Sequence, residues 1–379
     1  MTPGPPHAQS AIKHAVLTHA TKSDGGFRPC PNLINKDDSV IFWFMLYPNS
    51  YISVIGAGSW GTTLAAVLAE KGYDVTLWAY EKELAAAVNN DFVNPVYLPG
   101  FRLPHNIRAT SDPVEAVSQA RYIVSVVPTQ HIRPVFSDLK QSIRDESIII
   151  SASKGIEINT LLTPSMVLKE ILGRPVSVIS GPSFAREVMA KKPTAVTLGT
   201  EDKKTALLLQ EIFNTDYFRV YTHDDIIGVE IGGALKNVIA IASGISDGLD
   251  LGCDARAALI TRGLSEMARL GISLNAKERT FAGLSGLGDL VLTCTGPLSR
   301  NYTVGVKLGQ GMKITDITAR TKSIAEGVTT TLSAHELSLR QGVEMPLTEQ
   351  VYLTLYKDKS PAEAVRDLMT RSLKSEFNG

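Results

Sequence analysis

The stretch YISVIGAGSWGTTLA, residues 51–65, decides the fold of this chain. It opens with a short apolar run, residues 51–55, of the kind that forms a buried strand, and it ends in residues typical of a helix. Between the two, Gly56, Gly58 and Gly61 have the GxGxxG spacing. The spacing alone is a weak signal because glycine is common, but a glycine turn between a strand and a helix is typical of dinucleotide-binding folds. The alternative is a glycine turn in a similar fold that binds no cofactor.

Each glycine of this turn has its own predicted task. Gly56 permits the tight turn, Gly58 lets the backbone approach a pyrophosphate group, and Gly61 lets the helix pack closely against the strand. The first turn of the helix would then offer N–H groups and the positive end of its dipole to the phosphates.

The choice of cofactor depends on the end of the second predicted strand, DVTLW, residues 74–78. In NAD-specific folds an acid at this place binds the ribose 2′-hydroxyl. This chain has Ala79 there, followed by Tyr80 and Glu81, so we expect neither an acid placed to repel a 2′-phosphate nor an arginine placed to bind one. Tyr80 could stack on adenine, and Lys82 could reach a phosphate. NAD and NADP both stay open, with a slight preference for NADP.

Short apolar runs and helix-like segments alternate from residue 51 to about residue 225. The runs that are rich in Val and Ile read as buried strands, and they comprise residues 51–55, 74–78, 122–127, 147–151, 176–180 and 194–199. Strands that alternate with helices predict βαβ units and a mostly parallel sheet with helices on both faces. We therefore predict an α/β, Rossmann-like doubly wound domain over residues 51–225.

The strand patterns stop after residue 225, and residues 226–379 are predicted to form an all-helical C-terminal domain. A chain of 379 residues is too long for one ordinary core, which agrees with two domains. In the helical segment 255–271, the spacing places Arg262, Glu266 and Arg269 away from the apolar face. Arg262 and Glu266 are four residues apart, which favours a pair on the helix surface.

The first fifty residues have a different composition. They are rich in Pro, Gly and polar residues and show no helical or strand period, so residues 1–50 are predicted to be a disordered leader. Their apolar run, residues 40–46, is too short to span a bilayer and lacks the flanks of a signal peptide. For residues 1–44 two hypotheses stay open: a disordered extension, or a start codon placed too far upstream. Because no targeting signal is present, we expect a cytoplasmic protein.

The composition argues against several classes of partner. Lys and Arg total 38, as do Asp and Glu, and a net charge of zero gives no reason to expect nucleic acid or an acidic membrane surface as a partner. Stable membrane insertion is not expected either, because the apolar run at residues 40–46 is too short to span a bilayer. Cys30, Cys253 and Cys294 are far apart and form no CxxC pair, so neither a disulfide framework nor a metal site is expected. Recognition of a charged ligand must therefore be local.

One charged side chain, Lys236, interrupts the apolar segment GGALKNVIAIASG, residues 232–244. On a helix, its neighbours three and four residues away include no acid that could pair with it. Such a lysine can extend its amine to water, in which case it has no functional role. Alternatively it has a lowered pKa, because desolvation disfavours the ammonium. A lowered pKa would make Lys236 a candidate general acid and base.

Two further candidates follow predicted strands. Lys154 comes after the run at 147–151, and the Gly-Pro turn of SGPSFAREV, residues 180–188, comes after the next run. Both are therefore expected at the carboxyl edge of the sheet, where such folds bind ligands. The alternative for Lys154 is a solvated loop.

The last candidates lie in the predicted helical domain. Asp289 is placed among small and apolar residues, and Ser299, Arg300 and Asn301 lie at a predicted helix start. A cation beside the N–H groups of a helix N-terminus suits a phosphate monoester. The bland alternatives are a capping role for Asp289 and a surface ion pair for Arg300.

These motifs occur in the same order as in a known family. The segments GAGSWG, YLPG, SASKG, ISGPSFA, GGALKNVIAIASGISDG, AALITRGLSEM, GLGDLVLTCT, SRN and AEGVTT follow one another within residues 51–372. In this the chain resembles the soluble, bacterial-type glycerol-3-phosphate dehydrogenases that use NAD or NADP. Ordered matches across both predicted domains are specific, and the leader has no counterpart in the family.

The resemblance implies a reversible, NAD(P)H-dependent reduction of dihydroxyacetone phosphate to sn-glycerol 3-phosphate, which feeds glycerophospholipid biosynthesis. It implies that Lys236 accepts the proton of the C2 hydroxyl and returns it in reverse. The implied substrate-binding residues are Lys154, Gly181, Ser183, Lys236, Asp289, Ser299, Arg300 and Asn301. The implied cofactor-binding residues are Gly56, Gly58, Ser59, Trp60, Gly61, Tyr80, Tyr97, Lys154, Ala185, Arg300, Ile324 and Glu326.

Three points stay open at the level of sequence. Relatives often have a basic residue where this chain has Tyr80, so the family's cofactor preference does not carry over. One rival function is a dehydrogenase for another small hydroxy compound, and a second is a silent NAD(P)-binding redox sensor, although the sensor would be expected to lack Lys236 or Asp289. A homodimer is compatible with the sequence, which does not settle the oligomeric state.

Overall fold

A computed structural model describes residues 51–319, 325–373 and 375–376 of the 379-residue chain. The predicted leader, residues 1–50, and the predicted cofactor contact Ile324 lie outside the described residues. The contacts group Asn49–Gly379 into one compact unit. A domain boundary at residue 225 therefore stays a prediction.

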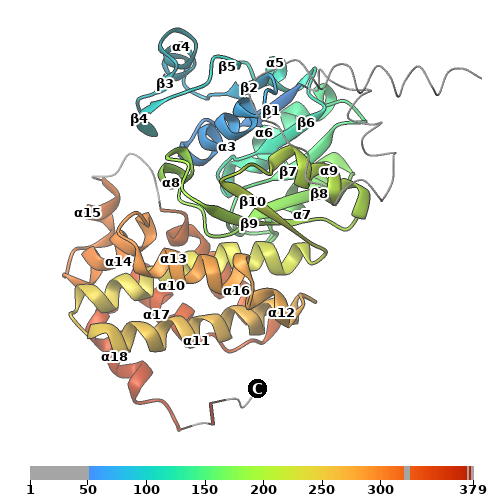
Figure 1. Ribbon diagram of the computed structural model, residues 1–379. Coiled ribbons are helices and arrows are strands. Elements are labelled where there is room, and N and C mark those ends of the chain that lie inside the picture. The colour runs from blue at the N-terminus through green and yellow to red at the C-terminus, as the bar shows by residue number, and fades with distance from the viewer. Residues whose placement is uncertain (1–50, 320–324, 374, 377–379) are drawn as a thin grey trace, which may run out of the picture. The chain divides into compact units, whose positions relative to one another are not determined.

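The strands form one mixed sheet and one small hairpin (Figure 1). The sheet contains β1 (Ile52–Ile55), β2 (Val75–Trp78), β5 (Ile107–Thr110), β6 (Tyr122–Ser125), β7 (Ile148–Ser151), β8 (Val176–Ser180), β9 (Thr194–Gly199) and β10 (Phe218–His223). Their order is β10-β9-β8-β7-β6-β1-β2-β5, and neighbouring strands are parallel except β8 and β9. The hairpin consists of β3 (Val93–Asn94) and β4 (Leu98–Arg102).

The mostly parallel α/β class is confirmed, and every predicted strand is present. Two strands at the edges of the sheet, β5 and β10, were not predicted. The exposed Arg108 interrupts β5, and β10 begins by alternating buried with exposed side chains, so neither strand forms a continuous apolar run. The antiparallel pairing of β8 with β9 was also not predicted, because the apolar patterns of these strands do not encode their direction.

The glycine turn lies at the point where the strand order reverses. From β1 the chain builds outward to β2 and β5, and it then returns to the other side of β1 to form β6, β7 and β8. In such sheets the ligand crevice lies beyond the carboxyl ends of the two strands where the order reverses. The turn after β1 and the loop after β6 therefore share this crevice.

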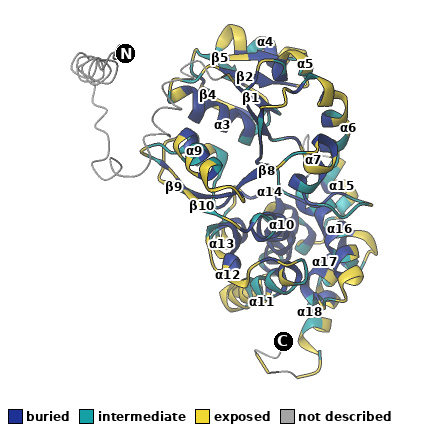
Figure 2. Ribbon diagram, turned by 90° about the vertical axis from the view of Figure 1, so that its right-hand side faces the viewer, coloured by how far each residue is buried: buried dark blue, intermediate teal, exposed yellow. Residues whose placement is uncertain are grey.

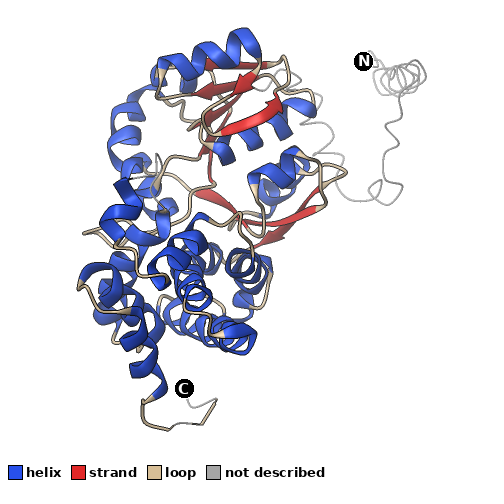
Figure 3. Cartoon of the chain, turned by 90° about the vertical axis from the view of Figure 1, so that its left-hand side faces the viewer, coloured by secondary structure: helices blue, strands red, loops and turns tan. Residues whose placement is uncertain are grey.

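Helices cover both faces of the sheet (Figure 3). One core is completed by α3 (Ser59–Glu70), α4 (Lys82–Asp91), α8 (Ala185–Met189) and α9 (Lys203–Phe213). The other core is completed by α5 (Pro113–Val117), α6 (Thr129–Leu139) with the short η1 (Lys140–Ser142), and α7 (Pro164–Leu172). The strands alternate between the two cores, since Val54 belongs to the first and Ile55 to the second.

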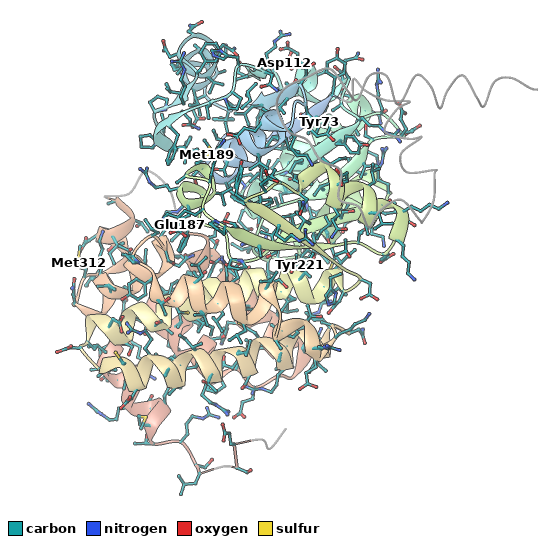
Figure 4. The ribbon with its side chains drawn as sticks, viewed as in Figure 1. Tyr73, Asp112, Glu187, Met189, Tyr221 and Met312 are labelled. Carbon is teal, nitrogen blue, oxygen red and sulfur yellow. The ribbon has the colours of Figure 1, made fainter. Side chains whose placement is uncertain are left out.

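Local capping fixes where some of these helices begin. The carboxylate of Asp112 accepts hydrogen bonds from the backbone N–H groups of Val114 and Glu115, at the start of α5 (Figure 4). An acid at the N-cap satisfies N–H groups that have no partner within the helix, and Pro113 suits the first helical position.

After residue 225 the described residues form only helices and connecting loops. These helices are α10 (Ile226–Gly248), α11 (Gly252–Ser273), α12 (Glu278–Phe281), η2 (Leu284–Gly288), α13 (Asp289–Thr295), α14 (Arg300–Gly309), α15 (Ile314–Ala319), α16 (Glu326–Gln341), α17 (Pro346–Tyr356) and α18 (Pro361–Met369). The predicted helical character of this region is confirmed.

The centre of the helical region is α10, which is buried continuously from Gly228 to Ser246 (Figure 2). It contacts α11, α13, α14 and α16, and it also contacts β8 of the sheet. Of the described helices, α10 alone is long and apolar enough to cross a membrane, but 89% of its apolar window is buried inside the protein. It is the core helix of a globular fold, and Lys236 lies near its middle.

Glycines let α10 and α14 touch backbone to backbone. A Cβ atom on Gly244 would lie 2.1 Å from the carbonyl oxygen of Tyr302, and one on Gly305 would lie 2.1 Å from that of Ile241. Both distances are far below van der Waals contact, so neither position accepts a larger residue without separating the helices. This contact fixes the start of α14 relative to Lys236.

The predicted surface position of Glu266 is wrong. Its side chain is only 1% exposed and accepts hydrogen bonds from the backbone N–H groups of Leu347 (2.6 Å) and Thr348 (3.1 Å), at the start of α17. Arg262 instead donates to the carbonyl oxygen of Glu376. Sequence spacing identifies neighbours on one helix, but the unsatisfied N–H groups of another helix offer Glu266 stronger partners.

The burial of Glu266 should make the stability depend on pH. Burial raises its pKa from 4.5 to about 7, although the hydrogen bonds from Leu347 and Thr348 oppose this shift. Between these two values the folded chain holds a proton that the unfolded chain has lost. The free energy of unfolding is therefore expected to fall as the pH rises through this window, by on the order of 1–3 kcal/mol.

Urea unfolding at pH 5, 6, 7 and 8 measures the slope of the free energy of unfolding against pH. Glu266→Gln is expected to be less stable at every pH because it loses an acceptor, but to have a flatter dependence on pH. Glu201→Gln, at an exposed position, is the matched control and should keep the slope of the wild type. An unchanged slope in Glu266→Gln would show that Glu266 does not cause it.

Candidate active site

A cavity of about 970 Å³ lies where the carboxyl edge of the sheet meets α10, α14 and α16. Most of the predicted site residues line it: Gly56, Gly58, Ser59, Trp60, Gly61, Tyr80, Tyr97, Lys154, Ser183, Ala185, Lys236, Ser299, Arg300, Asn301 and Glu326. Gly181 and Asp289 do not line the cavity but contact residues that do. The volume is large enough for a cofactor together with a small substrate.

The glycine turn has the geometry that its predicted tasks require. Gly56 has a φ of +118°, and a Cβ atom there would lie 2.8 Å from the carbonyl oxygen of Val126. A Cβ atom on Gly61 would lie 1.9 Å from the carbonyl oxygen of Gly56, so α3 and β1 could not pack as they do with any other residue. At Gly58 nothing lies within 4 Å of a Cβ position, so the turn leaves open space in front of the N-terminus of α3. Such a space fits a pyrophosphate group.

A buried carboxylate joins the two lysines of the site. Asp289, which is 0% exposed, accepts a hydrogen bond from Lys236 Nζ at Oδ1 (2.5 Å) and one from Lys154 Nζ at Oδ2 (2.7 Å). Lys154 also donates to the carbonyl oxygen of Gly181 (3.3 Å), to which Ser183 Oγ donates as well. Residues from three parts of the chain thus converge on one charge cluster.

The predicted low pKa of Lys236 has a physical cause in this arrangement. Burial is the largest contribution and lowers the pKa from 10.5 to about 8. The Asp289 carboxylate opposes this shift, and the positive charge of Lys154 adds to it. A lysine with a lowered pKa is therefore held beside a second lysine at the wall of the cavity.

The start of α14 also faces the cavity. Ser299 is its N-cap and accepts a hydrogen bond from the backbone N–H of Tyr302 (3.2 Å), which confirms the predicted helix start. The first turn of a helix directs N–H groups and a positive dipole end outward from its N-terminus. Together with the side chain of Arg300, this end can receive an anion.

Asn301 takes part in packing as well as in lining the cavity. Its Nδ2 donates to Oδ1 of Asn237 (2.9 Å), and its Oδ1 accepts from the backbone N–H of Gly327 (2.9 Å). The carboxamide thus ties α14 to α10 and to α16. The structure gives Asn301 a positioning role, and its implied contact with the substrate phosphate stays a prediction.

Glu326 brings a carboxyl group to the same cavity. Burial raises its pKa, although the nearby charges of Arg300, Lys154 and Lys236 act in the opposite direction. Glu326 is the first residue of α16, and the implied contact Ile324 lies outside the described residues.

Two residues at the site were missed by sequence reasoning. Thr293 Oγ1 accepts from Lys236 Nζ (3.0 Å) and donates to the carbonyl oxygen of Asp289 (2.6 Å). The signal for Thr293 was its position four residues after Asp289, which places both on one face of α13. Glu81, for which the sequence indicated no role at the site, lines the cavity and accepts a hydrogen bond from Tyr97 Oη.

The described residues contain no group of three or more His, Cys, Asp or Glu side chains that could hold a metal ion. The charged groups that line the cavity are instead two lysines, two arginines and two glutamates, and hydroxyl and carboxamide groups lie among them. This set suits an organic anion and a dinucleotide.

Comparisons with known proteins agree with this geometry. A family model described as the NAD-dependent glycerol-3-phosphate dehydrogenase N-terminus matches residues 51–206, and one described as the C-terminus matches residues 225–366. The glycerol-3-phosphate dehydrogenase [NAD(P)+] of Geobacter sulfurreducens is 55% identical over 329 residues, which cover 86% of this chain and 98% of that protein. That of Citrifermentans bemidjiense is 53% identical with the same coverage.

Solved structures give the same result. The crystal structure of glycerol-3-phosphate dehydrogenase from Coxiella burnetii matches with a TM-score of 0.83 and 42% identity, and the match covers 85% of this chain and 99% of that one. The family models, the relatives and this structure extend over both the sheet and the helical region. This chain therefore belongs to the NAD-dependent glycerol-3-phosphate dehydrogenase family.

Proposed function

We propose that this protein catalyses the reversible reduction of dihydroxyacetone phosphate to sn-glycerol 3-phosphate with NADH or NADPH. One observation carries the proposal: the buried Asp289 holds the ammonium groups of Lys154 and Lys236 at a cavity that also contains the glycine turn. A dinucleotide site and a proton-exchanging lysine in one cavity are what a reversible carbonyl reduction requires.

The glycine turn and its surroundings would hold the dinucleotide. Gly58, Ser59 and Trp60 line the cavity at the N-terminus of α3, where backbone N–H groups would bind the pyrophosphate. The aromatic rings of Tyr80 and Tyr97 suit the adenosine end, and Ala185, Arg300 and Glu326 would lie along the cofactor. When bound, the cofactor supplies a hydride to C2 of the ketone or accepts one from the alcohol.

Lys236 would carry the proton. In the reduction, its ammonium donates a proton to the oxygen on C2, and in the oxidation its neutral amine accepts the proton of the C2 hydroxyl. A pKa of about 8 keeps both forms accessible near neutral pH, which favours transfer in both directions.

Asp289 and Thr293 would orient this amine. Both accept hydrogen bonds from Lys236 Nζ, so its remaining donor position is free to point toward a substrate oxygen. Lys154, held on the other oxygen of Asp289, would add positive charge where the C2 oxygen becomes negative.

The phosphate group of the substrate would bind at the start of α14. Ser299, Arg300 and Asn301 belong to this end, and its N–H groups and dipole favour an anion. The phosphate is remote from the reacting carbon, and its binding energy would position C2 next to the cofactor and Lys236.

We further propose that the enzyme acts in the cytoplasm and that its product feeds glycerophospholipid synthesis. The absence of net charge supports small-molecule rather than nucleic-acid partners. The apolar helix α10 is buried within the fold rather than offered to a bilayer.

The direct test follows NADH and NADPH oxidation at 340 nm by the purified protein with dihydroxyacetone phosphate. Saturable turnover is expected with the phosphorylated substrate and only trace turnover with dihydroxyacetone, because the phosphate provides the binding energy. Turnover with a 3-hydroxy acid in place of the phosphate would overturn the proposal. Binding of a cofactor without any turnover would instead support a redox sensor.

A further inference from the structure

Glu81 stands at the start of α4 but does not act as a helix cap. It occupies the N-cap position, and its side chain accepts no hydrogen bond from the first turn of the helix. Instead, Tyr97 Oη donates to Oε1 of Glu81 at 2.6 Å, and both side chains line the cavity. Within the described residues no hydrogen bond reaches Oε2. Tyr97 therefore holds the carboxylate through Oε1, and Oε2 can still accept a hydrogen bond from a ligand.

A chain of hydrogen bonds connects this carboxylate to the glycine turn. Asn94 is fully buried, and its Nδ2 donates to the carbonyl oxygen of Ala57 (2.9 Å) and to Thr62 Oγ1 (2.8 Å). Its Oδ1 accepts from the backbone N–H of Tyr97 (2.9 Å), and Tyr97 in turn holds Glu81. Glu81 thus has a fixed position relative to the turn that would bind the pyrophosphate.

The hydrogen bond also keeps Tyr97 in its donor form. Its pKa is raised, chiefly because the bond to Glu81 favours the protonated phenol and also because of partial burial. Tyr97 therefore stays a hydrogen-bond donor throughout the neutral pH range.

The cavity-lining residues near Glu81 in the sequence carry no positive charge. The end of β2 and its connection to α4 contribute Trp78, Tyr80 and Glu81 to the wall, the turn between β3 and β4 contributes Tyr97, and none of these is basic. Lys82 is exposed and does not line the cavity. Arg186 lines it, but its guanidinium donates to the carbonyl oxygen of Pro99 and lies over the ring of Phe101.

We propose that the Glu81–Tyr97 pair selects a dinucleotide with a free 2′-hydroxyl on its adenosine ribose, NAD(H), over one with a 2′-phosphate, NADP(H). Glu81 follows the last glycine of the turn by twenty residues, where an acid in such folds meets the ribose. A hydroxyl can donate to the available Oε2, whereas a phosphate places negative charge against the carboxylate. The proposal rests on the proposed function, since the cavity must bind a dinucleotide.

This inference reverses the slight preference for NADP that the sequence alone suggested. The strand that precedes α4 ends at Trp78, and no acid follows it directly. Glu81 lies three residues further on, at the start of α4, and its side chain lines the cavity. Its hydrogen bond with Tyr97 could not be foreseen from the sequence.

Isothermal titration of the full chain with NADH and with NADPH tests the proposal without relying on catalysis. The wild type is expected to bind NADH about tenfold more tightly than NADPH, and the ratio should fall as salt screens the repulsion. ADP-ribose and its 2′-phosphate should show the same ratio, because they differ from each other only in the 2′-phosphate and contain no nicotinamide.

Variants separate charge from positioning. Glu81→Gln should reduce the NADH-to-NADPH affinity ratio about fivefold and remove its salt dependence, because the amide carries no charge. Tyr97→Phe should weaken NADH binding but keep the discrimination against NADPH, since the carboxyl group of Glu81 is retained. Glu83→Gln, an exposed acid two residues away that does not line the cavity, is the control and should match the wild type.

The outcomes distinguish this inference from the function on which it rests. Equal or tighter binding of NADPH by the wild type, or an unchanged ratio in Glu81→Gln, would overturn the selectivity and leave the dehydrogenase proposal standing. Failure of both dinucleotides to bind would overturn both.

Discussion

Lys236→Ala is expected to lower turnover with dihydroxyacetone phosphate by about 10³-fold or more, while the affinity for the cofactor stays nearly unchanged. The alanine removes the proton donor and one of the cations beside the C2 oxygen, so two contributions to the transition state are lost together. The residues proposed for the pyrophosphate belong to α3, which the substitution does not touch. Steady-state rates at 340 nm and titration with NADH give the two values.

Two controls make this result specific to the amine. Lys203→Ala removes an exposed lysine at the start of α9 and should leave the rate unchanged. Added methylamine is expected to restore part of the activity of Lys236→Ala, because a small amine can enter the space that the side chain leaves. If Lys236→Ala turned over substrate as fast as the wild type, the proposed mechanism would be wrong.

Asp289→Ala is expected to reduce both activity and stability. The substitution leaves the ammonium groups of Lys154 and Lys236 without their shared carboxylate in a buried site, which should destabilise the fold by about 3 kcal/mol. Turnover should fall by on the order of 10²-fold, because Lys236 loses the acceptor that orients it. Urea unfolding and steady-state rates measure the two effects.

Asp289→Asn separates charge from shape in this cluster. The amide keeps an acceptor but loses the negative charge that raises the pKa of Lys236. The pKa of Lys236 should therefore fall, and the rise of the oxidation rate with pH should move to lower pH than in the wild type. Lys154→Gln removes a positive charge that lowers the same pKa, so it should move the profile to higher pH. Shifts of both variants in the same direction would contradict the assignment.

Much of the fold could be predicted because its signals are local. The glycine turn and the six apolar runs lie within short stretches of sequence, and each central strand is buried on both faces, so its pattern is continuous. The edge strand β10 was not predicted because Arg219 and Tyr221 are exposed and interrupt its apolar residues. Pattern reasoning therefore finds the centre of such a sheet more readily than its margins.

The partners of the site residues could not be predicted from spacing. Lys236 and Asp289 are 53 residues apart in sequence and meet only because α13 packs against α10. Glu266 shows the same limit in reverse, since its true partner, the start of α17, is 81 residues away. Residue types and resemblance suggested which groups matter, but the bonds between them follow from how the helices pack.

A newly made chain exposes α10 before the ribosome has produced any of the helices that later cover it. During that interval the helix contains an apolar window with a mean hydropathy of 1.5, which is the composition of a membrane span. An ammonium near the centre of such a helix opposes transfer into lipid by about 3 kcal/mol. We therefore expect Lys236 to oppose mistargeting of the nascent chain, a consequence separate from the proton transfer proposed for it in the folded protein.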